Sequence, residues 1–217
     1  MNMKINNCRI RNRFVVAGMV FIAFLLLGCT NDDTDPILID ENDTGSADSM
    51  YEEFLNNELP VMIDHENEEY SFYYEHFEKN WDYYEGYTPE FIRLDFDNDG
   101  QNELAWNELF YGTTIIDARD NNLYILAEGG GTTDVCSYTF YNNEVWIVYS
   151  DTTHTGREKY YFHKFNGNGE IVDSFNLSAE YWDEPDDRYN ESSDFTYRDE
   201  KISMQEFENI RMKYLGY

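Results

Sequence analysis

Five residues between positions 95 and 103 have the types and the spacing of a cation-binding loop. Asp95, Asp97 and Asp99 occupy alternate positions, Gly100 follows them, and Glu103 closes the series. Alternate residues of a tight loop can direct their carboxylate oxygens at one point, and glycine permits the positive φ that folds the chain back. Calcium is bound by oxygen ligands of this kind, so the spacing predicts one Ca²⁺ held by the four carboxylates.

The neighbouring sequence favours a loop between two strands over an EF-hand. The flanking segments FIRLDF and ELAWNEL are strand-like, and position 12 of the loop, where an EF-hand needs glutamate, is Trp106. In such a loop the carbonyl of Gln101 can also point inward. The pattern D-x-D-x-D-G-x-x-E resembles the calcium loops of FG-GAP and VCBS-type repeats. It occurs once, so the resemblance does not imply a propeller fold, and in so acidic a chain a bare turn is the alternative.

The N-terminus has the pattern of an export signal. Residues 1–13 contain four basic residues and no acidic one, and residues 14–27 are all apolar. This run is shorter than the roughly 20 residues that span a bilayer, which favours a signal peptide over a transmembrane helix. The sequence Leu26-Leu27-Gly28-Cys29 resembles the lipobox of bacterial lipoproteins, which implies cleavage before Cys29 and diacylation of its sulfur. An ordinary secretory signal and an uncleaved anchor are the alternatives.

These features predict a chain in three parts. Residues 1–28 form the signal peptide, residues 29–48 an acidic flexible tether, and residues 49–217 a domain on the extracytoplasmic side of a bacterial cell membrane. The tether is rich in Asp, Asn, Ser and Thr and lacks the periodicity of a core element. The lipobox, the acidic spacer, the segment FLNNELP and the Asp-rich loop together resemble a group of bacterial lipoproteins without an established activity.

The net charge excludes one class of partner. The chain has 15 Lys and Arg against 44 Asp and Glu, a net charge of −29, and loss of residues 1–28 would change it to −33. Such a surface is a poor partner for nucleic acid. The expected partners are the membrane, through the lipid anchor, and an unidentified extracellular ligand, glycan or protein.

The sequence contains no recognisable catalytic set. Cys136 stands among apolar residues without a neighbouring base, and the four histidines lack the spacing of a zinc site. We therefore expect a non-catalytic binding module without hydrolytic turnover. Two alternatives stay open: a secreted hydrolase with paired carboxylates, which needs only geometry and one raised pKa, and a subunit of a surface assembly.

Aromatic residues make up 18% of the chain and can serve a core or a binding surface. The sequence favours the core, because aromatic side chains can fill it where Leu and Val are few. A surface stacking face is the second interpretation. It would consist of Trp146, Tyr160, Tyr161, Tyr181 and Trp182.

The elements that must position the loop are mostly strands. Eight β-type runs lie between residues 90 and 177, separated by hairpin sequences such as DNDG, RDNN and NGNG. Helices are expected after Ser49, between Phe72 and Tyr84, and after Ser203, which forms a capping box with Glu206. The predicted fold class is α+β: a twisted antiparallel β-meander with an aromatic-rich N-terminal helical part and a C-terminal helix.

Overall fold

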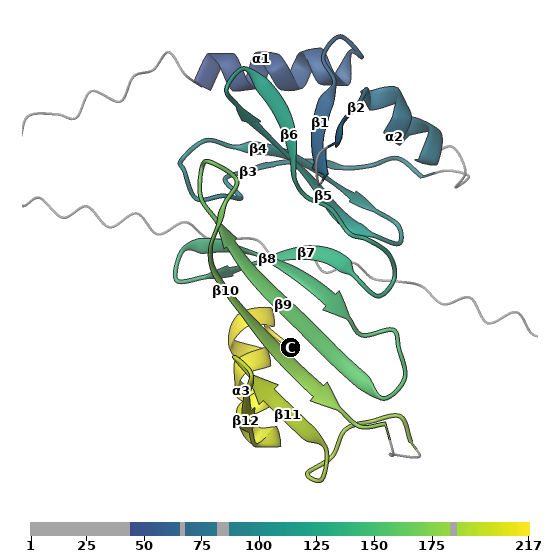
Figure 1. Cartoon of the computed structure of the whole chain (residues 1–217), viewed down its shortest axis with the longest axis vertical. Helices are drawn as coiled ribbons and strands as arrows, with labels where there is room; N and C mark the ends of the chain where they lie inside the picture. Colours follow the sequence, from purple (N-terminus) through teal and green to yellow (C-terminus); the bar gives the residue numbers. More distant parts are fainter. Residues whose placement is uncertain (1–43, 66–67, 82–86, 183–185) are drawn as a thin grey trace, which may run out of the picture. The chain divides into compact units, whose positions relative to one another are not determined.

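The computed structural model describes residues 44–65, 68–81, 87–182 and 186–217, which form an open mixed sheet with three helices (Figure 1). The predicted signal peptide and most of the predicted tether lie outside the described residues. The helices are α1 (Thr44–Leu55), α2 (Tyr74–Trp81) and α3 (Met204–Leu215). The strands are β1 (Val61–His65), β2 (Glu68–Phe72), β3 (Phe91–Leu94), β4 (Glu103–Glu108), β5 (Gly112–Arg119), β6 (Asn122–Ala127), β7 (Val135–Tyr141), β8 (Glu144–Asp151), β9 (Arg157–Phe165), β10 (Ile171–Glu180), β11 (Asp194–Tyr197) and β12 (Glu200–Ile202). The α+β class is confirmed.

Strands joined by short turns pair antiparallel, as predicted. This holds from β3 through β6, from β7 through β10, and for β11 with β12. The expectation of a wholly antiparallel sheet is wrong, because β1 runs parallel to β6 and β5 runs parallel to β7. The second parallel pair arises because β7 follows β6 along the chain but adds beside β5, and therefore points the same way as β5.

The helix ends test the predicted helix starts at Ser49 and at Ser203. The Ser203 hydroxyl accepts from the Glu206 amide at 3.3 Å, and the Glu206 carboxylate accepts from the Ser203 amide at 2.8 Å, so the predicted capping box is confirmed. The prediction of a helix start at Ser49 is wrong, because α1 begins at Thr44. The Ser49 hydroxyl instead donates to Glu53 one turn further along the helix.

Strand alternation distributes the buried side chains over three clusters. On β4, Leu104 and Trp106 join the cluster under α1 and α2, whereas Ala105 belongs to a second cluster. On β8, Trp146 belongs to a third cluster, to which α3 contributes. The second cluster takes side chains from both groups of strands, the group β3–β6 and the group that begins with β7. It also includes Phe96, which follows Asp95 in the acidic loop.

The two groups of strands meet at a narrow junction that we call the glycine seam, formed by Gly112, Gly129 and the backbone of Tyr111 and Cys136. The single β5·β7 pair places Gly112 opposite Cys136, whose amide donates to the Tyr111 carbonyl at 2.9 Å. A Cβ at Gly112, where φ is +86°, would lie 1.9 Å from the Cys136 carbonyl oxygen, and a Cβ at Gly129 would lie 1.8 Å from that of Tyr111. Neither position has room for a side chain.

Candidate metal centre

The loop between β3 and β4 is folded by its own carboxylates. The Asp99 amide donates to Asp95 Oδ1 at 3.0 Å and to Asp97 Oδ1 at 3.1 Å, and the Gly100 amide donates to Asp95 Oδ2 at 3.1 Å. Asn98 and Gly100 have positive φ values of 66° and 96°, which reverse the chain direction. The aspartates are therefore held on the inner side of a tight turn, as their spacing predicts.

These carboxylates form two overlapping groups. Ligand oxygens of Asp95, Asp97 and Asp99 lie within 4.8 Å of one another, and so do those of Asp97, Glu103 and Asp117. Asp97 belongs to both groups. We call the five residues together the carboxylate site, and the ligand oxygens within either group lie close enough together to hold a metal ion.

Sequence reasoning missed Asp117. It lies on β5 within the run TTIIDA, and an acidic residue inside an apolar strand was the available signal. The predicted ligand Gln101 lies beside the site. Its backbone N–H donates to Asp99 Oδ1 at 2.7 Å.

The inner group is buried and incompletely bonded. The exposed fractions of Asp97, Glu103 and Asp117 are 1%, 1% and 4%. Glu103 Oε2 accepts from the amides of Phe96 and Asp97, but within the described part of the chain Asp97 Oδ2 and Asp117 Oδ2 are buried and accept no hydrogen bond. Arg119 Nε lies 3.3 Å from Asp117 Oδ2, close enough for an ion pair although it donates no hydrogen bond to that oxygen. Buried polar atoms normally have a partner, so Asp97 Oδ2, which has neither a hydrogen bond nor an ion pair in the described residues, points to a missing ligand.

Burial and mutual repulsion raise the pKa values of this group. Burial, and then the charge of Asp99, raise the pKa of Asp97 to about 7. Burial and the charge of Asp97 raise the pKa of Glu103 to about 9, and burial raises the pKa of Asp117 to about 6 against the opposing effect of Arg119. A cation between these oxygens would lower the three pKa values again, because its positive charge offsets the repulsion between the carboxylates and its coordination replaces the solvation lost on burial.

Neighbouring elements hold the loop from outside. The Asn98 side chain accepts from the Val145 amide at 2.7 Å and donates to the Val145 carbonyl at 3.2 Å, which fixes the loop to β8. The Asp99 side chain packs against Gly167 in the β9–β10 turn, where an added Cβ would lie 2.8 Å from Asp99 Oδ2. The carboxylate site is therefore supported by both groups of strands.

The proposed aromatic face does not form as one exposed surface. Trp146, Tyr160 and Tyr181 are buried in the α3 cluster, whereas Tyr161 and Trp182 are 44% and 58% exposed. Adjacent residues of a strand point to opposite faces, which separates Tyr160 from Tyr161.

Two cysteines bear on the predictions. Cys136 is buried, and burial raises the pKa of its thiol to about 12, as expected of an inert cysteine. Cys29, the predicted lipidation residue, lies outside the described residues.

Comparison of the chain with protein families, with curated proteins and with solved structures finds no match. Within the ranges that the structure describes, no helix is long and apolar enough to cross a membrane. The geometry of the carboxylate site is therefore the basis for a functional proposal.

Proposed function

We propose that this chain is a lipid-anchored extracytoplasmic protein whose α+β domain is a non-catalytic binding module with one structural Ca²⁺. The observation that carries the proposal is the buried Asp97 Oδ2, which accepts no hydrogen bond in the described residues and lies beside the buried carboxylates of Glu103 and Asp117. Both groups of the carboxylate site offer oxygen ligands alone. Calcium takes six to eight oxygens in flexible geometry, whereas zinc prefers nitrogen and sulfur and magnesium demands a near-ideal octahedron.

The ion would bring together residues from two elements. Asp95, Asp97, Asp99 and Glu103 would supply carboxylates, the Gln101 carbonyl a further oxygen, and Asp117 a ligand from β5. Burial argues against the hydrolase alternative at this site. A catalytic carboxylate must touch its substrate, whereas the carboxylates with the most strongly raised pKa values, Asp97 and Glu103, are each 1% exposed.

We predict that calcium stabilises the domain. A site with a Kd on the order of 10⁻⁴ M, filled at millimolar Ca²⁺, contributes roughly 1.4 kcal/mol to the free energy of unfolding. For a domain of this size that raises the Tm by about 3–6 °C. Thermal unfolding of residues 44–217, with chelator and then with millimolar Ca²⁺, measures this difference.

Two double variants, each of which replaces two aspartates by asparagine, test whether the effect of calcium depends on the carboxylate site. The double variant Asp97→Asn, Asp99→Asn should lose the calcium-induced rise in Tm. The double variant Asp173→Asn, Asp194→Asn removes two carboxylates that form surface ion pairs and should keep the rise. An unchanged Tm in the wild type, or an equal rise in both variants, would favour the bare turn.

A separate prediction concerns the anchor. The lipobox-like sequence before Cys29 implies acylation of that cysteine, and an acyl chain holds a protein on a membrane surface without a membrane-spanning helix. Replacement of Cys29 by Ala should release the domain into the medium or leave the precursor uncleaved. Metabolic labelling with a fatty-acid analogue checks this, and equal labelling of wild type and Cys29→Ala would contradict lipidation.

A further inference from the structure

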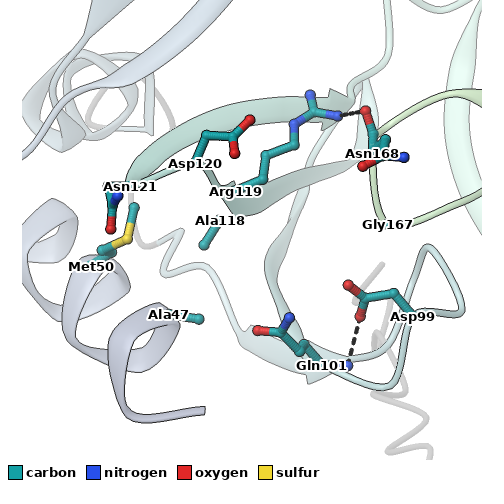
Figure 2. A pocket seen from close by; sticks show the side chains of 10 residues that line it. All are labelled: Ala47, Met50, Asp99, Gln101, Ala118, Arg119, Asp120, Asn121, Gly167 and Asn168. Atoms are coloured by element: carbon teal, nitrogen blue, oxygen red, sulfur yellow. Dashed lines mark hydrogen bonds between the residues drawn. The ribbon is translucent and has the colours of Figure 1, made fainter. Parts of the chain in front are cut away.

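A polar cavity lies beside the carboxylate site and shares Asp99 with it. Its volume is about 360 Å³, and its walls come from α1, the β3–β4 loop, the end of β5 with the β5–β6 turn, and the β9–β10 turn (Figure 2). The polar side chains that line it are Asp99, Gln101, Arg119, Asp120, Asn121 and Asn168. Pockets for small ligands begin at about 300 Å³, so one sugar ring can fit.

Arg119 is fixed in place before any ligand binds. Its Nε lies 3.3 Å from Asp117 Oδ2, its guanidinium donates to the Asn168 carbonyl, and the same group lies 4.6 Å from the centroid of the Tyr124 ring. Figure 2 shows the arginine extending to Asn168 across the cavity wall. The remaining N–H groups therefore have a set direction, which lowers the entropy lost when they bind a ligand.

The composition of the wall excludes two classes of ligand. Apolar ligands need apolar walls, whereas Met50, Ala47 and Ala118 are the apolar contributors here. Anionic ligands are disfavoured because Asp99 and Asp120 line the cavity, the charge of Arg119 is offset by Asp117, and the whole chain carries −29.

We propose that this cavity binds a neutral saccharide in the presence of the cation, a role that rests on the proposed calcium site. Carboxylates accept hydrogen bonds from hydroxyl groups, the guanidinium donates to them, and side-chain amides do both. The wall thus offers donors and acceptors in the mixture that a polyol requires. Met50 on α1 supplies an apolar contact for the C–H groups of a sugar ring.

A bound cation would order the cavity wall through Asp99 and Gln101, which belong to both the predicted ligand set and the cavity lining. Asp99 lies in the outer group of the carboxylate site, and its Oδ1 accepts the amide of Gln101, whose side chain lines the cavity. A bound ion would neutralise part of the local negative charge and hold Asp99 in one orientation. Saccharide binding should therefore be stronger with calcium than with chelator.

Saturation-transfer NMR on residues 44–217 tests the proposal. The probes are the methyl glycosides of glucose, galactose, mannose and N-acetylglucosamine, with methyl glucuronide as the anionic probe and ethanolamine as the cationic probe. At least one neutral glycoside should give signals in millimolar Ca²⁺ that weaken with chelator, and the glucuronide should give none. An ammonium ligand would show the opposite calcium dependence, because it competes with Ca²⁺ for the same carboxylates.

The decisive variants alter the cavity and spare the ion. Gln101→Ala with Asp120→Asn keeps the backbone carbonyl of Gln101 and should weaken the bound glycoside about tenfold, as expected for the loss of roughly 1.4 kcal/mol of hydrogen bonding. The rise in Tm with calcium should persist in this variant. The control Gln205→Ala with Asp194→Asn changes exposed residues on α3 and β11 and should bind as the wild type does.

The outcomes separate the two proposals. A calcium-induced rise in Tm with no signal from any neutral glycoside overturns the saccharide site alone, and so does binding that the cavity variant leaves unchanged. Stronger binding of the glucuronide or of ethanolamine than of the neutral glycosides also overturns it. Absence of the rise in Tm overturns the calcium site and, with it, the calcium dependence proposed for the cavity.

Discussion

In the presence of chelator, the domain should lose stability as the pH rises from 6.5 to 9. Burial and neighbouring charge raise the pKa of Asp97 to about 7 and that of Glu103 to about 9 in the folded state. A group whose folded pKa is raised favours folding fully below its unfolded pKa and loses that contribution as the pH passes its folded pKa. Both groups therefore destabilise the ion-free fold progressively across this range.

The expected loss is large. One pKa unit corresponds to ~1.4 kcal/mol, and in this window the shifts of Asp97 and Glu103 together amount to a few kcal/mol against the roughly 5–15 kcal/mol that keeps a typical domain folded. The Tm with chelator should fall by about 10 °C. Below this window His163 acts in the opposite direction, because burial lowers its pKa.

Calcium should reverse this trend. Ions bind the ionised carboxylates and release protons from them, so the calcium-induced rise in Tm should grow with pH. Scanning calorimetry at pH 6.5 and pH 9, with and without Ca²⁺, measures all four values. The variant Asp97→Asn, Glu103→Gln should flatten the pH dependence in chelator, whereas the exposed-residue variant Glu191→Gln should keep it. An equal slope in the first variant and the wild type would show that other groups cause it.

The second large effect is expected at Trp106. Its side chain is fully buried and its ring lies 5.2 Å from that of Phe77 and 6.2 Å from those of Phe54 and Phe91. Truncation leaves a cavity between α1, α2 and β4, so Trp106→Ala should lower the free energy of unfolding by about 3–5 kcal/mol. Urea unfolding followed by circular dichroism gives this difference.

Two comparison variants make the test specific. Trp182 is 58% exposed, so Trp182→Ala should cost under about 1 kcal/mol. If Trp106→Ala does not fold, Trp106→Phe should fold with a smaller loss, because it keeps most of the buried area. An equal loss of unfolding free energy in Trp182→Ala and Trp106→Ala would contradict the assignment of Trp106 to the core.

The sequence predicts the parts of this fold that depend on local chemistry. The capping box at Ser203, the eight strands between residues 90 and 177 and the turn at Gly100 all follow from residues close together in the chain. The loop residues Asp95, Asp97 and Asp99 are brought together for the same reason, since a short turn leaves their side chains few other directions.

The remaining features depend on contacts between distant segments. Asp117 joins the site because β5 pairs with β4 in the register that places Ile116 opposite Leu104, and no local pattern specifies that register. The parallel pairing of β1 with β6 likewise joins segments that are far apart in the chain, so no local sequence pattern specifies it. The favoured interpretation, that aromatic side chains fill the core, holds for Trp146, Tyr160 and Tyr181, whereas the alternative of one exposed face does not, because Tyr160 and Tyr161 lie on opposite faces of their strand.

The glycine seam constrains the sequence at two positions, whatever changes occur on the surface of the protein. Backbone carbonyl oxygens occupy the space where a side chain would stand at Gly112 and Gly129, so both positions must stay glycine in any descendant that keeps the junction between β5 and β7. A relative that keeps this junction should therefore also keep two glycines 17 positions apart, the first of them shortly after the acidic loop.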